Sequence, residues 1–131
     1  MPRTSIFDPV LCEVAYRWFC PPGGVVLDPF AGGSVRGIVA ARLGLRYIGH
    51  ELRAEQVEAN RAQAAAICAG DAHAPRWIIG DSRGIDETCA DVDADLVFSC
   101  PPYQTLRKYT ADDLRAIRDD YRARLKAITW A

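Results

Sequence analysis

The sequence lacks the patterns that mark several common classes of protein. It has five cysteines but no CxxC pair, two histidines, and no apolar run near the roughly 18 residues of a membrane span. It also lacks the dinucleotide-binding GxGxxG and the Gly-Lys-Ser/Thr of a P-loop. Neither His50 nor His73 has neighbours that resemble metal ligands, so we expect both to be ordinary polar residues. We therefore expect no membrane span, no metal site and neither of these phosphate-binding loops.

Composition narrows the remaining classes. The chain has 131 residues, of which 50% are hydrophobic and 25% charged, and it contains no internal repeat or evident linker. These values predict one domain over residues 1–131, somewhat small for a complete α/β enzyme. The cysteines are odd in number and scattered, and no secretory leader is evident, so we expect a cytoplasmic protein with mostly buried thiols. They are Cys12, Cys20, Cys68, Cys89 and Cys100.

Charge alone does not favour a nucleic-acid partner, because the formal net charge is -1. Basic residues nevertheless crowd the last quarter of the chain: Arg107, Lys108, Arg115, Arg118, Arg122, Arg124 and Lys126. Acidic residues lie among them: Asp112, Asp113, Asp119 and Asp120. A basic binding face and a solvated helix face both remain open.

A helix is predicted near the start of the chain and another near its end. Asp8 is a good cap, Pro9 suits the first helical position, and apolar residues continue at helical spacing to Phe19. We expect this first helix to bury the stripe formed by Val10, Leu11, Val14, Ala15 and Trp18. The stretch 110–131 has a similar stripe made of Leu114, Ile117, Tyr121, Leu125 and Ile128.

Four apolar stretches predict buried strands of a parallel sheet, and each strand ends in residues suited to ligand binding or catalysis. The first, from Val25, ends in Asp28 and runs into Gly32-Gly33, where the backbone can approach a ligand closely. The next begins at Tyr47 and ends in Glu51, with a helix marked by Val35, Ile38, Val39 and Leu43 and closed by Gly44 before it. The third covers Trp77 to Ser82 and contains Asp81, and the fourth runs from Asp95 into Cys100-Pro101-Pro102-Tyr103.

Glu51 has two interpretations on its own evidence. It lies 23 residues beyond Asp28, a suitable place for an acid that accepts hydrogen bonds from ribose hydroxyls. It could equally be a surface residue that caps the next helix, which Val57, Asn60, Ala64 and Ile67 outline.

Taken together, these motifs resemble the amino-methyltransferases that use S-adenosylmethionine to modify adenine or cytosine in DNA. Val26 to Gly32 resembles their cofactor loop, Tyr47 to Glu51 their ribose-binding strand, and Gly80-Asp81-Ser82 their adenine-contacting turn. The resemblance implies a Rossmann-like class I core, a mostly parallel sheet flanked by helices in the order third, second, first, fourth. It also implies a set of cofactor-binding residues: Asp28, Pro29, Phe30, Ala31, Gly32, Gly33, Glu51, Leu52, Asp81 and Ser82.

The last motif resembles the family's catalytic Asp/Asn/Ser-Pro-Pro-Tyr/Phe loop, with a cysteine at its first position. An exocyclic amino group must become pyramidal to attack a methyl group, and acceptors aimed at its hydrogens favour that form. The resemblance implies that the Pro101 carbonyl and the Cys100 side chain are these acceptors, with Pro102 fixing the backbone and Tyr103 stacking on a flipped base. A thiol is a weak acceptor. Cys100 as a covalent nucleophile, or as a merely structural residue, remains open.

Two differences from the family shape the functional prediction. Ser34 stands where the usual loop has glycine, and the family's three further strands and target-recognition region have no counterpart after Tyr103. The fourth strand would keep an open edge, which invites a homodimer or a partner chain. We expect a partial core of an enzyme that methylates adenine or cytosine in DNA, as in restriction-modification. Alternatives are a non-catalytic module that binds S-adenosylmethionine and an RNA-directed methyltransferase.

Overall fold

A computed structural model describes residues 7–101 and 119 of the chain. Residues 1–100 form one compact unit and residues 101–131 a second, and all the helices and strands named here belong to the first. The prediction of one domain over 1–131 stays a prediction. The expected helix after residue 110, together with Pro102 and Tyr103, lies outside the described residues.

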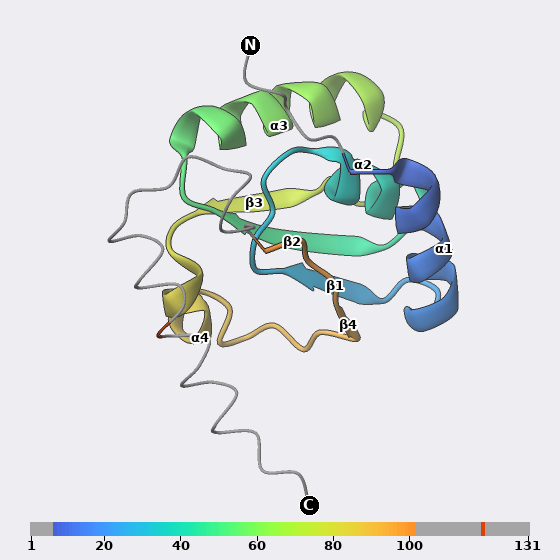
Figure 1. Cartoon of the computed structure of the whole chain (residues 1–131). Helices are drawn as coiled ribbons and strands as arrows, with labels where there is room; N and C mark the ends of the chain where they lie inside the picture. The colour runs from blue at the N-terminus through green and yellow to red at the C-terminus, as the bar shows by residue number, and fades with distance from the viewer. Residues whose placement is uncertain (1–6, 102–118, 120–131) are drawn as a thin grey trace, which may run out of the picture. The chain divides into compact units, whose positions relative to one another are not determined.

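The described unit contains a four-stranded parallel sheet with the order β3-β2-β1-β4 (Figure 1). This confirms the predicted α/β class and the predicted strand order. The elements in chain order are α1 (Pro9–Phe19), β1 (Val25–Asp28), α2 (Val35–Arg42), β2 (Arg46–Glu51), α3 (Ala54–Ile67), β3 (Arg76–Ile79), the 3-10 helix η1 (Ser82–Gly84), α4 (Ile85–Thr88) and β4 (Leu96–Val97). The start of α3 and the turn before α4 lie at the left of Figure 1, where β2 and β3 end, and the loop from the end of β1 rises through the middle of the view to α2.

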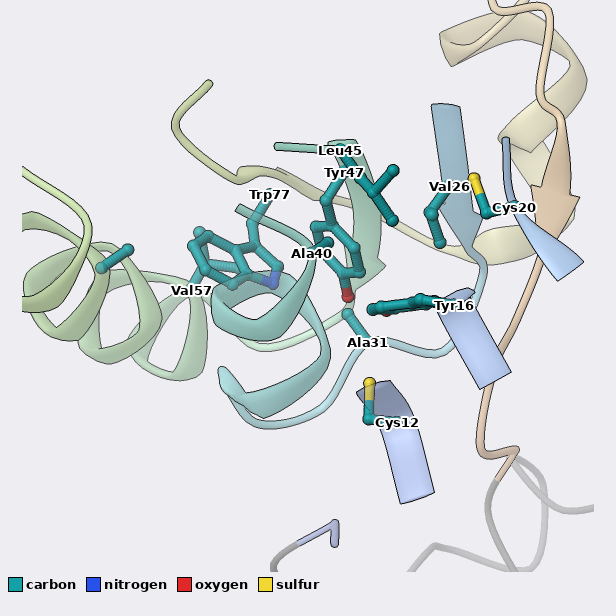
Figure 2. Packing of buried hydrophobic residues seen from close by; sticks show 11 residues of the cluster. Cys12, Tyr16, Cys20, Val26, Ala31, Ala40, Leu45, Tyr47, Val57 and Trp77 are labelled. Carbon is teal, nitrogen blue, oxygen red and sulfur yellow. The ribbon is translucent and has the colours of Figure 1, made fainter. Parts of the chain in front are cut away.

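Two aromatic residues fill the space between the sheet and α2. Tyr47 of β2 and Trp77 of β3 are each 2% exposed, and their ring centroids are 5.8 Å apart. Figure 2 shows both rings beside Ala40 of α2. A Cβ at Gly37 would lie 2.5 Å from the Trp77 ring, so only glycine lets α2 approach this closely. Small residues of α2 therefore face the sheet, whereas the stripe that predicted the helix is only half-buried.

The predicted bounds of α1 are confirmed, but its predicted buried stripe is wrong. Cys12 and Tyr16 are buried at 0% and 1% exposure, whereas Val10, Leu11 and Trp18 are 57% to 75% exposed. The reason is a polar anchor that apolar periodicity does not reveal. The Tyr16 hydroxyl donates a buried 2.8 Å hydrogen bond to the Arg36 carbonyl, which turns the opposite face of the helix toward α2.

The last two strands are shorter than predicted. β3 ends at Ile79 because the Asp81 side chain accepts from the Arg83 amide and caps η1, which starts at Ser82. β4 contains only Leu96 and Val97 because its neighbour β1 ends at Asp28. After Asp28 the chain enters residues 29–34, the glycine loop, which connects β1 to α2. The helix α4 was not predicted, because four residues show no periodicity.

The cysteine prediction is confirmed for four of the five thiols. Cys12, Cys20, Cys68 and Cys89 are buried, Cys100 is half-buried, and all five are free. Burial raises the pKa of the Cys12 thiol to about 11. No helix in residues 7–101 is long and apolar enough to cross a membrane.

Candidate functional site

Three acidic residues lie at the edge of the sheet where its strands end. Asp28 is the last residue of β1, Glu51 is the last of β2, and Asp81 follows β3 by two residues. The parallel pairing of these strands brings their carboxyl ends to one edge, as the sequence predicts. Their environments differ sharply, and so do the tasks that they can perform.

The Asp28 carboxylate is fully buried and accepts from four donors. Arg36 Nε donates to Oδ2 at 2.7 Å and the Tyr47 hydroxyl at 2.5 Å, while the Ser99 hydroxyl donates to Oδ1 at 2.6 Å and the Phe30 amide at 3.3 Å. Burial, and then the neighbouring carboxylate, raise the pKa of Tyr47 well above its ordinary value, so that this phenol stays protonated and donates. Asp28 therefore connects the start of the glycine loop with Arg36 and Ser99 and fixes its position.

Arg36 is a site residue that the sequence analysis missed. It is 5% exposed, and its Nη2 donates 2.8 Å hydrogen bonds to the carbonyls of Phe30 and Ala31 as well as pairing with Asp28. Burial alone would lower the pKa of Arg36, but the charge and the hydrogen bond of Asp28, together with smaller contributions, raise it overall. Its guanidinium also lies 4.9 Å from the Phe7 ring centroid. An arginine eight residues after a strand-end aspartate, in a helix otherwise lined by small residues, was the available signal.

Side chains of β2 and α3 form hydrogen bonds with the backbone of the glycine loop. Gly32 has φ +57, a left-handed conformation that favours glycine. Its amide donates to Glu51 Oε2 at 2.9 Å, and its carbonyl accepts from Asn60 Nδ2 at 2.8 Å. Ser34 has ordinary helical angles and a hydroxyl bonded to Gln63, so this position needs no glycine. The departure from the family loop at Ser34 leaves the turn intact.

The edge also offers a surface that a nucleoside-like ligand could occupy. Apart from its chain neighbours, no described residue lies within 4 Å of a Cβ placed at Gly33, so that the loop presents bare backbone to these residues. The apolar side chains of Leu52 and Ile79, at the ends of β2 and β3, are 57% and 49% exposed. Exposed apolar side chains beside two carboxylates suit a ligand with a flat base and a ribose, so the residues fit S-adenosylmethionine.

Asp81 is the most accessible of the three acids. Its side chain is 40% exposed and pairs with Arg83, whose Nε lies 2.8 Å from Oδ2. Hydrogen bonds from Arg83 lower the pKa of Asp81. Ser82, the neighbouring predicted site residue, is half-buried in the same turn.

Ser99, the residue that precedes the predicted catalytic loop, contacts the glycine loop. The Ser99 hydroxyl accepts from the Phe30 amide at 2.9 Å in addition to its bond to Asp28. Cys100 is half-buried and Pro101 is exposed. Thus the structure brings Asp28, Phe30 and the residue before Cys100 together, a contact that the sequence analysis did not foresee.

His50 was predicted to be an ordinary polar residue, and the structure places it in the interior. It is 1% exposed on β2, with Nε2 2.8 Å from the Thr88 hydroxyl of α4 and 3.7 Å from Cys89 Sγ. Its Nδ1 has no hydrogen-bond partner in the part of the chain that the structure describes. Burial lowers the pKa of His50. Among the described residues, no group of histidine, cysteine, aspartate and glutamate could hold a metal ion.

The described unit has the Rossmann-like α/β fold of methyltransferase cores, with its glycine loop between β1 and α2. Comparison with known proteins agrees with this. Residues 10–62, from α1 into α3, match the model of the DNA methylase family N6_N4_Mtase. TrmN from Thermus thermophilus has a similar solved structure, with a TM-score of 0.63 and 22% sequence identity.

These two findings support the resemblance to the amino-methyltransferases that the motifs indicated. The match to TrmN covers 86% of this chain but 32% of that protein, so the chain spans about a third of its length. The family match ends before β3 and does not include Cys100.

Proposed function

We propose that this chain is the cofactor-binding and catalytic core of a methyltransferase that uses S-adenosylmethionine and acts on an exocyclic amino group of adenine or cytosine in DNA. The observation that carries the proposal is the glycine loop at the edge of the sheet. The buried pair Asp28 and Arg36 and the Glu51 carboxylate form hydrogen bonds with its backbone. The loop backbone is uncovered by other described residues at Gly33.

The edge would hold the cofactor through groups with distinct tasks. Glu51 would accept from the ribose hydroxyls, since each carboxylate oxygen can take more than one donor and, among the described residues, Oε2 accepts only from the Gly32 amide. Leu52 and Ile79 would contact the faces of the adenine, and Asp81 would accept from its amino group. S-adenosylmethionine supplies the methyl group.

The reaction needs acceptors for the hydrogens of the target amino group. Cys100 and the Pro101 carbonyl would provide them at the end of β4. Tyr103 would stack on a base extruded from the duplex. If Cys100 acts only as an acceptor, Cys100→Ser keeps or raises activity, because a hydroxyl accepts better than a thiol. A covalent adduct of the wild-type protein with DNA that carries a fluorinated cytosine would contradict this role.

The test combines binding and transfer. Calorimetry with S-adenosylhomocysteine should detect binding to the full chain, and labelled S-adenosylmethionine should transfer its methyl group to duplex DNA. Single-stranded RNA and free nucleotides are parallel substrates. Binding without transfer to any of them would support a non-catalytic module, transfer to RNA alone would support the RNA-directed alternative, and no binding would overturn the proposal.

We also propose that β4 pairs with a second copy or with a partner chain. Among the described strands β4 pairs only with β1, and Val97 is 61% exposed. Light scattering should then report a dimer or a larger species. A concentrated sample that remains monomeric, yet methylates a defined DNA sequence, would contradict this proposal.

A further inference from the structure

Ser99 joins two loops that are far apart in the sequence. Its hydroxyl donates to Asp28 Oδ1 at 2.6 Å and accepts from the Phe30 amide at 2.9 Å, across separations of 71 and 69 residues. A serine hydroxyl has one hydrogen to donate, and here it goes to a carboxylate, which makes the stronger, charge-assisted kind of hydrogen bond. One side chain therefore ties the end of β4 to both ends of the short turn that begins the glycine loop.

The position of this tie matters because the next residue is Cys100. Adjacent Cα atoms are about 3.8 Å apart, so Cys100 lies one peptide unit from the tie. The Phe98 amide, on the other side, donates to the Leu27 carbonyl at 3.1 Å, which fixes the preceding residue. Phe30 is therefore connected to Cys100 through one hydrogen bond, the Ser99 side chain and one peptide unit.

We propose that Ser99 is a positioning residue: it sets Cys100 against the glycine loop and transmits ligand binding at that loop to Cys100. This inference rests on the proposed function for the identity of the ligand, but not for the tie itself. Ser99 would not contact substrate. If it merely stabilised β4, its loss would lower stability without changing how Cys100 responds to the ligand.

Cys100 provides a direct readout. It is half-buried, whereas the other four cysteines are buried, so alkylation by iodoacetamide should modify it first. Peptide mass spectrometry then gives its rate separately from that of Cys12, which is 0% exposed and reports whether the variant is folded.

The first arm needs no ligand. Ser99→Ala should raise the alkylation rate of Cys100 by about fivefold, the factor that corresponds to a typical lost hydrogen bond. Thr88→Ala removes a hydroxyl from α4, outside both loops, and should leave the rate unchanged. An unchanged rate in folded Ser99→Ala overturns the proposal. If Ser99→Ala fails to fold, Ser99→Thr and Ser99→Val provide the same comparison, because they have similar shapes and differ in the hydroxyl; equal rates for these two overturn it as well.

The second arm adds S-adenosylhomocysteine. It should change the Cys100 rate in the wild type and in Ser99→Thr, and the change should be lost in Ser99→Ala although calorimetry still detects binding. A variant that binds the ligand and keeps the full response overturns the transmission. Absence of binding to the wild type counts against the proposed function instead, and the ligand-free arm still decides whether Ser99 positions Cys100.

Discussion

Asp28 and Asp81 occupy comparable places, one at the end of β1 and one just beyond β3, but the environments of their carboxylates differ. Asp28 is 0% exposed and accepts from four donors that come from β2, α2 and both loops. The Asp81 side chain is 40% exposed and accepts from Arg83, two residues away.

The difference shows that the place of an acid at a strand end does not define its role. A carboxylate surrounded by donors from several elements is committed to the fold, and exchanging any partner for a ligand would leave a buried group unsatisfied. A carboxylate held by one neighbouring arginine can accept from a ligand at little cost. We therefore expect ligand recognition at this edge to depend on Asp81 and Glu51, and Asp28 to determine the conformation of the loop.

The largest effect should come from Asp28→Asn. The substitution leaves Arg36 buried without its counter-charge, and removing one partner of a buried ion pair typically costs about 3 to 5 kcal/mol. Urea denaturation should show this loss in the free energy of unfolding. The matched control is Asp81→Asn. If both variants unfold at the same urea concentration as the wild type, the contrast between the two aspartates is wrong.

An intermediate effect is expected at Glu51, whose carboxylate is both a loop partner and the proposed ribose acceptor. Losing a charged acceptor costs about 1.5 to 3 kcal/mol, so Glu51→Ala should weaken S-adenosylhomocysteine binding at least about tenfold in calorimetry. Glu51→Gln keeps one acceptor oxygen for the Gly32 amide and separates loop damage from lost recognition. Unchanged affinity in folded Glu51→Ala would remove this residue from the site.

His50 should make stability depend on pH below its ordinary pKa of 6.5. Burial lowers its pKa in the folded state, so the unfolded chain binds a proton first as the pH falls. Its contribution is fully present above pH 6.5 and is lost as the pH falls toward the lower pKa of the folded state. Thermal unfolding of His50→Gln should show a weaker decline over this range, with Thr88 and Cys89 left in place. An identical decline would mean that other groups cause it.

The smallest effect on stability should come from Asp81→Asn. An exposed ion pair contributes about 0 to 1 kcal/mol, and because the pKa of Asp81 is lowered, its contribution is lost only as the pH falls below about 3.8. The same variant should nevertheless weaken S-adenosylhomocysteine binding. A stable Asp81→Asn with undiminished affinity would show that exposure alone does not identify the recognition residue.

Much of the fold could be predicted from the sequence because its determinants are local. The Asp8-Pro9 start of α1, the apolar run of β1 and the glycine loop each depend on adjacent residues. The strand order followed from the family resemblance and is confirmed.

The parts that failed depend on contacts between distant residues. The buried face of α1 is set by the hydrogen bond from Tyr16 to Arg36, 20 residues away, and the burial of Arg36 is set by Asp28. The role of Ser99 depends on a partner 71 residues earlier. No periodicity in a single sequence reports such pairings. The three acids at the strand ends could be predicted because their positions follow from local patterns. The different environments of their carboxylates could not be predicted, because they depend on distant residues.

The partners of Asp28 also enter the growing chain in a fixed order during synthesis. Arg36 and Tyr47 follow it by 8 and 19 residues, but Ser99 follows it by 71. Domains generally fold as units, and contacts between residues distant in sequence are slow to form. A nascent chain that has not reached β4 already contains Arg36 and Tyr47, but it lacks the hydroxyl that accepts from the Phe30 amide in the folded protein. The glycine loop would thus take its final form only when the segment bearing Cys100 arrives.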